Sequence, residues 1–163
     1  MARALIALGG NVGDVRAAFE KAIANICGMT QGTLLARSSD YATPPWGEVQ
    51  QERFINACIE IETSLDPHAL LFTMKKIETK FGRDRVKERR WGPRTLDLDL
   101  IAYDDVSMQK PELTLPHPRL FERAFVLVPL AEISPDRVIG GRSIATALAE
   151  LSTEGIERLP DPV

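Results

Sequence analysis

The chain has 163 residues, of which 44% are hydrophobic and 26% are charged, and its formal net charge is −3. A chain of this length can bury roughly 70% of its unfolded surface, so we expect a single globular domain over residues 1–163 that needs no disulfide to fold. The acidic balance argues against general affinity for nucleic acid. The sequence shows neither a signal peptide nor an apolar run of membrane-spanning length, and Cys27 and Cys58 form no CxxC pair. We therefore expect a cytoplasmic protein with free thiols.

The first part of the chain predicts six elements in the order strand, helix, strand, strand, helix, strand. Two runs of apolar residues at helical spacing each follow an aspartate that can cap the first turn, and Pro67 directly follows the second of these caps. Short apolar or alternating runs indicate the strands. The expected ranges are a strand at 3–8, a helix at 14–28, strands at 33–41 and 54–62, a helix at 66–82 and a strand at 95–103.

The remainder of the chain predicts two short helices and a loose end. The apolar pattern indicates helices at 126–133 and 143–151, and Pro129 should kink the first of them or lie in its first turn. His117 lies between two prolines in an extended segment, where it can meet a phosphate or simply face solvent. We expect the tail from Ser152 onward to be loose.

Alternation along residues 54–62 places Phe54 and Asn56 on one face of a strand. An amide beside an aromatic ring can recognise the edge of a heterocycle, although a cross-strand hydrogen bond is the more common role of a lone asparagine. The segment before this strand, Thr43-Pro44-Pro45-Trp46-Gly47, is stiffened by its prolines and can present backbone groups to a planar ligand.

The most strongly charged stretch of the chain runs from Lys75 to Arg94. It contains nine lysines and arginines against three acids, so its local charge is +6 in a protein whose net charge is −3. Clustered cations attract a polyanion, and arginine offers paired contacts to phosphate oxygens. The glycine-rich turn at Gly9–Asp14 has neither the dinucleotide nor the P-loop spacing, so a nucleotide would have to be bound elsewhere.

Two carboxylates follow this basic stretch in the run Thr95-Leu96-Asp97-Leu98-Asp99-Leu100. Period-two alternation predicts a strand from which Asp97 and Asp99 project on the same face, about 7 Å apart. Such a pattern alone is typical of a strand with a solvated outer face. Because the carboxylates repel each other and adjoin the arginines, we favour a site where Mg²⁺ relieves that repulsion during chemistry on a phosphate chain.

Five segments of the chain carry a resemblance to a known family. They are Leu8-Gly9-Gly10-Asn11-Val12-Gly13-Asp14, Thr43-Pro44-Pro45, Phe54-Ile55-Asn56-Ala57, Arg90-Trp91-Gly92-Pro93-Arg94-Thr95-Leu96-Asp97-Leu98-Asp99 and Leu115-Pro116-His117-Pro118-Arg119. In these segments the chain resembles the 6-hydroxymethyl-7,8-dihydropterin pyrophosphokinase family of the folate pathway. The resemblance covers nearly the whole chain, and the run from Arg90 to Asp99 is its most specific part. The fold it implies is α+β and ferredoxin-like, with helices packed on a central antiparallel sheet. The activity it implies is transfer of pyrophosphate from ATP to the hydroxymethyl group of the pterin, with release of AMP.

The resemblance also implies roles for individual residues. Asp97 and Asp99 would bind two Mg²⁺ ions that bridge the phosphates of ATP, the co-substrate. Arg83 and Arg94 would hold the phosphate oxygens and offset their charge during the transfer. The residues implied for the pterin are Thr43, Pro44, Trp46, Phe54, Asn56, Trp91 and Phe125. The residues implied for the nucleotide are Leu71, Arg85, Trp91, Arg94, Leu100, Thr114, His117 and Arg123.

Several expectations and alternatives accompany this interpretation. Which of the arginines at 83, 85, 89 and 90 contact phosphate is left open, because the length of the basic loop varies between members. The glycines flanking this loop predict that it is mobile until ATP binds. We expect a monomer with small-molecule partners only. A metal-dependent phosphohydrolase, an ordinary kinase and an RNA-binding module of the same fold remain alternatives; the last would leave Asp97 and Asp99 unexplained.

Overall fold

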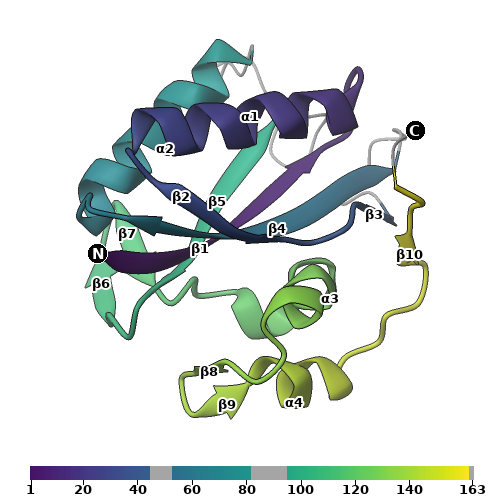
Figure 1. Ribbon diagram of the computed structural model, residues 1–163. Coiled ribbons are helices and arrows are strands. Elements are labelled where there is room, and N and C mark those ends of the chain that lie inside the picture. The colour runs from purple at the N-terminus through teal and green to yellow at the C-terminus, as the bar shows by residue number, and fades with distance from the viewer. Residues whose placement is uncertain (45–52, 82–94, 162–163) are drawn as a thin grey trace.

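The computed structural model describes residues 1–44, 53–81 and 95–161. Over these residues the chain forms one antiparallel main sheet with helices on both faces (Figure 1). The strands are β1 (Ala2–Gly10), β2 (Thr33–Arg37), β3 (Tyr41–Thr43), β4 (Phe54–Thr63), β5 (Asp97–Tyr103), β6 (Met108–Lys110), β7 (Leu113–Leu115), β8 (Val138–Ile139), β9 (Arg142–Ser143) and β10 (Glu157–Arg158). The helices are α1 (Val15–Met29), α2 (Pro67–Lys80), the 3₁₀ turn η1 (Leu120–Glu122), α3 (Ala124–Ile133) and α4 (Ile144–Ala149).

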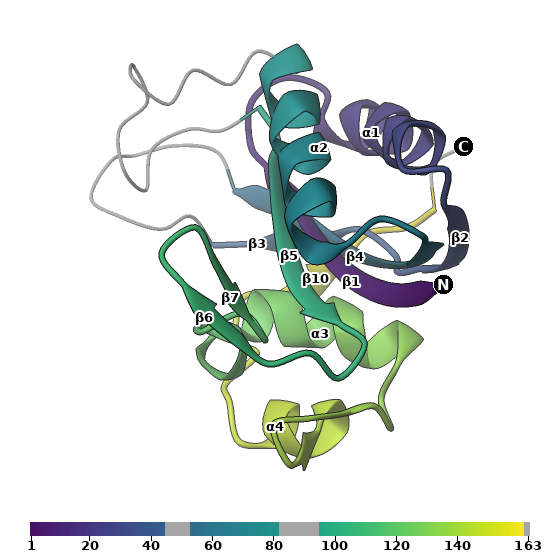
Figure 2. The ribbon, with the colours of Figure 1, turned by 90° about the vertical axis from the view of Figure 1, so that its left-hand side faces the viewer.

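Strand β1 lies near the centre of the main sheet. The strand order is β10-β3-β4-β1-β5, and β2 also pairs with β4. All of these pairings are antiparallel. Helices α1 and α2 cover one face, while α3 and α4 lie on the other (Figures 1 and 2). The main sheet therefore lies between two layers of helices.

Alternating side chains of the strands divide the core into two apolar clusters, one on each face. The first lies between the sheet and helices α1 and α2, and the second lies between the sheet and helices α3 and α4. Representative buried members of the first are Ile6, Phe19, Ile59, Met74 and Leu98. Representative buried members of the second are Leu5, Cys58, Ile101, Leu127 and Ile144.

Both predicted aspartate caps are present. The Asp14 carboxylate accepts the backbone N–H of Ala17, and the Asp66 carboxylate accepts that of Ala69. Each satisfies an amide that the first helical turn leaves without a partner in the helix. Pro129 lies at the sixth position of α3, beyond the first turn.

Two sequence predictions about the strands were wrong. The strand expected at 33–41 is divided into β2 and β3: at Ser38 the side-chain hydroxyl, in place of a backbone carbonyl, accepts the N–H of Cys58 on β4, and the Asp40 side chain pairs with Arg16. The tail after Ser152 is not loose, because β10 pairs with β3 at the edge of the main sheet. Among the described residues, no helix is long and apolar enough to cross a membrane.

Candidate active site

The two predicted metal ligands lie side by side on β5. Asp97 and Asp99 are both partly exposed, while the alternate residues Leu98 and Leu100 are buried in the core. On the neighbouring strand, Gly9 is opposite Asp97 and Ala7 is opposite Asp99. β1 therefore presents nothing larger than a methyl group opposite the two carboxylates.

A cation from the loop before α3 lies beside the second carboxylate. Arg123 places Nη1 3.7 Å from Oδ2 of Asp99, and the exposed fractions of the two side chains are 18% and 45%. The guanidinium carbon also lies 5.6 Å from the ring centroid of Phe125. Burial lowers the pKa of Arg123, against the opposing effect of Asp99. An arginine retains its charge despite such a shift, so this side of β5 carries both signs of charge.

The geometry of His117 assigns its tautomer. Its Nδ1 accepts the backbone N–H of Arg119 at 3.1 Å, so the neutral ring carries its proton on Nε2. Burial lowers the pKa of His117; Asp99 opposes this shift, whereas Arg123 and Arg119 add to it. Its backbone N–H also donates to the carbonyl of Ile101 at 2.8 Å, which fixes the residue against β5. The neutral ring can therefore donate one hydrogen bond from Nε2.

Asn56 on β4 and Thr43 on β3 form a second polar group, on the other side of β1 from the aspartates. Nδ2 of Asn56 donates to the Thr43 hydroxyl at 2.7 Å, and both side chains are buried. Gly9 lies opposite Asn56, and a Cβ built on Gly9 would be 2.8 Å from Oδ1 of Asn56. Such a distance is shorter than real contacts allow, so the amide occupies the space that a side chain on Gly9 would need.

The carboxylate of Glu78 is a feature that sequence reasoning missed. Glu78 lies on α2, is almost fully buried, and accepts the backbone N–H of Leu98 at 2.8 Å. It thereby fixes the backbone of β5 between the two aspartates. A signal was available in the sequence, because Glu78 follows Leu70 and Met74 at the spacing of the apolar stripe that faces the core.

The structure brings some of the predicted residues together and separates others. Asp99, His117, Arg123 and Phe125 lie on the α3 side of the sheet, and the electrostatic effects on His117 and Arg123 show that both lie near Asp99. Leu100 is instead buried in the cluster on the α2 side, with Leu71 packed against it. Residues predicted for the nucleotide therefore lie on both faces of β5, and their contact with the nucleotide stays a prediction.

The other predicted residues divide into those the structure describes and those it does not. Thr114 lies on the short strand β7, and Pro44 directly follows β3. Phe54 begins β4 and pairs with Thr43. The predictions for Trp46, Arg83, Arg85, Arg89, Arg90, Trp91 and Arg94, and for a mobile loop over residues 83–92, lie outside the described residues.

The described part of the site offers hard oxygen ligands rather than a nucleophile. Burial raises the pKa of the Cys58 thiol far above its usual range, and the charge of Asp99 adds to this effect. That thiol is completely buried in the second core cluster, so no ligand can reach it. Among the described residues, no cluster of three or more His, Cys, Asp or Glu side chains could hold a metal ion. A cation at Asp97 and Asp99 would thus need further oxygen ligands from its phosphate ligand and water.

This edge of the sheet combines paired carboxylates with a neighbouring arginine and a neutral histidine. Such a combination is typical of a protein that binds a phosphorylated ligand. Comparisons with known proteins show the family. The sequence model of the 7,8-dihydro-6-hydroxymethylpterin-pyrophosphokinase family matches residues 5–135. The chain therefore belongs to this family.

Individual relatives agree with that assignment. The chain is 48% identical over 159 residues to the 2-amino-4-hydroxy-6-hydroxymethyldihydropteridine pyrophosphokinase of Methylorubrum extorquens, covering 98% of this chain and 99% of the relative. It is 40% identical to the protein of the same name from Pseudomonas aeruginosa, covering 97% of each. A Plasmodium falciparum HPPK-DHPS chain solved with pterin and p-hydroxybenzoate has a TM-score of 0.74 at 13% identity, covering 96% of this chain and 46% of that chain. This last likeness shows the shared fold.

Proposed function

We propose that the chain transfers the terminal diphosphate of ATP to the hydroxymethyl group of 6-hydroxymethyl-7,8-dihydropterin and releases AMP, as a step of folate biosynthesis. Membership of the pyrophosphokinase family and the names of the full-length relatives support this activity. The hydroxymethyl oxygen attacks the β-phosphorus, the bond from that phosphorus to the oxygen bridging the α-phosphate breaks, and the hydroxyl proton passes to water.

The single structural observation that carries the proposal is the register around Gly9. This residue is opposite Asn56 on one side and opposite Asp97 on the other. A polar group suited to a heterocycle edge and a carboxylate suited to a cation–phosphate complex therefore flank one glycine. Two substrates held at these groups would meet over β1, where Gly9 has no side chain and Ala7 has only a methyl group.

The donor set fits Mg²⁺, although the number of ions remains part of the proposal. Asp97 and Asp99 present carboxylate oxygens from one strand face, and oxygen ligands of this kind suit Mg²⁺. When bound, the metal would offset the charge that develops on the phosphate oxygens. Arg123 adds a positive charge at the same edge, and the Nε2–H of His117 can donate to a phosphate or ribose oxygen.

The pterin would be held by stacking and by hydrogen bonds. Phe54 and Phe125 would stack on its two faces. Asn56 and the backbone at Thr43 and Pro44 would recognise its polar edge. The described residues supply these groups without a general base near the pair of aspartates, and diphosphate transfer can take most of its rate from positioning and charge neutralisation.

The assignment of a ferredoxin-like fold is part of the same proposal. If β2 and β3 are counted as one interrupted strand, the elements from β1 to β5 follow the order strand, helix, strand, strand, helix, strand, and their sheet order β3-β4-β1-β5 is antiparallel. This arrangement supports a ferredoxin-like core. The monomeric state and the cytoplasmic location stay predictions.

Phosphorus NMR of the protein with MgATP and reduced hydroxymethylpterin tests the proposed activity. We expect AMP and a new diphosphate ester to appear together, and only when the pterin is present. Removal of Mg²⁺ with EDTA should stop both. An ordinary kinase would yield ADP instead, and a phosphohydrolase would release inorganic phosphate or diphosphate without pterin. Either of these products would overturn the proposal.

A further inference from the structure

The C-terminal segment from Gly155 to Asp161 is fixed to the edge of the sheet next to the residues proposed for the pterin. Glu157 pairs with Ala42, and Arg158 pairs with Tyr41. The backbone N–H of Leu159 donates to the carbonyl of Asp40 at 2.9 Å. Figure 1 shows this segment running beside β3 from the α4 side of the molecule to the α1 side.

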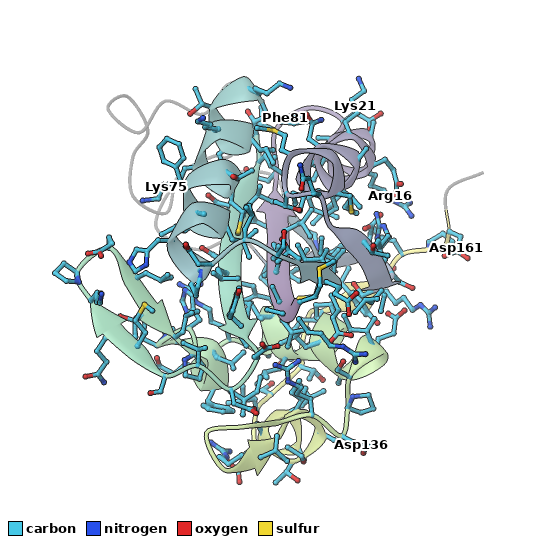
Figure 3. The ribbon with its side chains drawn as sticks, turned by 60° about the vertical axis from the view of Figure 1, so that its left-hand side comes forward. Arg16, Lys21, Lys75, Phe81, Asp136 and Asp161 are labelled. Carbon is cyan, nitrogen blue, oxygen red and sulfur yellow. The ribbon has the colours of Figure 1, made fainter. Side chains whose placement is uncertain are left out.

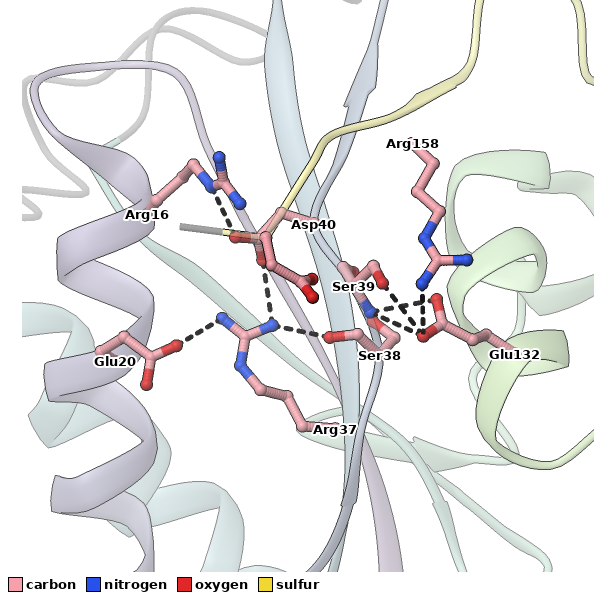
Figure 4. A pocket seen from close by; sticks show the side chains of 9 residues that line it. Arg16, Glu20, Arg37, Ser38, Ser39, Asp40, Glu132 and Arg158 are labelled. Carbon is pink, nitrogen blue, oxygen red and sulfur yellow. Dashed lines mark hydrogen bonds and ion pairs between the residues drawn. The ribbon is translucent and has the colours of Figure 1, made fainter. Parts of the chain in front are cut away.

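Charged side chains hold the far end of this segment. Nη2 of Arg16 donates to the carbonyl of Pro160 at 2.6 Å, while its Nε pairs with Asp40 at 2.8 Å. Figure 3 shows Arg16 and Asp161 on the same side of the molecule. The hollow of about 380 Å³ seen in Figure 4 lies here, and Arg16, Asp40 and Arg158 are among the residues that line it. Figure 4 shows Asp40 bonded to Arg16 and Arg37, and Arg158 of the segment pairs with Glu132 at 4.0 Å. These contacts, with the bond from Arg16 to Pro160, anchor the segment.

Arg53 holds the near end. Its Nη2 donates to the carbonyl of Ala42 at 3.0 Å and to that of Gly155 at 2.7 Å, so one nitrogen links β3 to the C-terminal segment. Its Nη1 pairs with Glu157 at 3.3 Å, but both side chains are about half exposed or more. Such an exposed pair contributes little by itself. The two carbonyl contacts are therefore the important part of the link.

Gly155 lies close to Pro44, one of the residues proposed for the pterin. A Cβ built on it would lie 2.9 Å from Cγ and 3.5 Å from Cδ of Pro44, and its φ of +83° is one that side chains disfavour. Ala42 and Pro44, which both lie against this segment, are the neighbours of Thr43. Thr43 in turn accepts the amide of Asn56.

We infer that Arg53 and Gly155 are positioning residues for the pterin: they place the C-terminal segment against Ala42 and Pro44 and so set the position of Thr43 and its bond to Asn56. This inference rests on the proposed function, because it takes the pterin to bind at these residues. It assigns a role in substrate affinity to a part of the chain whose sequence alone predicts a loose tail.

Glycine gives a matched test. Gly155→Ala adds a methyl group that must displace Pro44, whereas Gly141→Ala adds one at almost the same φ, +82°, with nothing within 4 Å. Both variants carry a similar backbone penalty, but only the first disturbs the pterin side. We expect Gly155→Ala to raise the KM for the pterin at least fivefold over Gly141→Ala, while the KM for ATP of each stays within twofold of wild type.

Arg53 gives a second test that does not depend on a glycine. Arg53→Gln should also raise the pterin KM at least fivefold, and Arg53→Lys should restore part of the affinity because the ammonium can still reach a carbonyl. Glu157→Gln should change it less than twofold. Thermal unfolding of each variant shows how far any loss is one of stability.

The outcomes separate the inference from the proposed function. If Gly155→Ala and Gly141→Ala give the same pterin KM, or if Arg53→Gln raises the KM for ATP and for pterin equally, the inference is overturned. If the wild-type chain forms AMP and Asn56→Ala weakens pterin binding in the same assays, the proposed function stands in either case. If the wild-type chain forms no AMP, the proposed function fails first.

Discussion

Gly9→Ala would test the arrangement of the site with a single methyl group. The added Cβ would lie 2.8 Å from Oδ1 of Asn56, so the amide must move. Its side chain is buried and donates to Thr43 at 2.7 Å, and loss of that bond would cost about 0.5–1.5 kcal/mol of stability. Replacing glycine in a strand offsets about 0.5–1 kcal/mol of this cost, because the unfolded chain loses backbone freedom.

The free energy of unfolding should therefore change by less than about 1 kcal/mol. Pterin binding has no such compensation. A hydrogen bond from Asn56 that is lost to the pterin corresponds to roughly 1 kcal/mol, and a displaced amide also obstructs the ligand, so we expect the KM for pterin to rise about tenfold. The KM for ATP should stay within about twofold of wild type, because the change lies on the side of β1 that faces β4.

Steady-state kinetics with each substrate varied in turn, together with urea unfolding, measure these quantities. Gly28→Ala is the matched control, since a Cβ there would meet nothing within 4 Å. Gly28 lies within α1, where alanine should stabilise the helix by up to about 1 kcal/mol without any effect on substrate affinity. An unchanged pterin KM in Gly9→Ala would refute the placement of the pterin edge at Asn56.

Three further predictions concern the other side of β1. Asp97→Ala and Asp99→Ala should each lower turnover at least about 100-fold, through lost charge stabilisation of several kcal/mol, with little change in melting temperature because both side chains are partly exposed; near-normal turnover at ordinary Mg²⁺ concentration would contradict the metal site. Glu78→Ala should lower the free energy of unfolding by about 1–3 kcal/mol in urea titrations, because the buried N–H of Leu98 loses its acceptor, and Glu78→Gln should recover much of that loss. The pKa of His117 is lowered mainly by burial, so the unfolded chain binds more protons just below pH 6.5, and wild-type stability should fall there as the pH drops, by up to about 1.4 kcal/mol per pH unit. Urea unfolding of His117→Gln should show a shallower decline over that range, and an equal decline would show that His117 binds its proton as readily when folded.

The sequence correctly predicted those helices and strands that are determined by residues close together in the chain. The alternation of β4 correctly separated Ala57 and Ile59 from Cys58, and the caps at Asp14 and Asp66 correctly marked two helix starts. In each case a side chain within a few residues decides the backbone geometry. The same reasoning placed Asp97 and Asp99 on one face of a strand.

Contacts between distant segments decided what the sequence could not predict. Glu78 was counted as one of three acids in a basic stretch, yet it is buried because a backbone N–H of β5, 20 residues away, needs an acceptor at the sheet edge. The C-terminal segment has too few apolar residues to predict a strand, and β10 forms because β3 offers an unpaired edge.

The small residues of β1 separate the two polar groups of the site. Asn56 and Asp97 are each paired with Gly9, so their backbones are about two strand spacings apart, roughly 10 Å. A larger residue at position 9 would displace the amide on one side, and bulk at position 7 would crowd the space beside Asp99 on the other. Proximity of two bound substrates can supply much of the rate of a transfer reaction that has no nucleophile on the enzyme. The proposed reaction thus depends on a strand that keeps both groups at a fixed distance and places no side chain of its own between them.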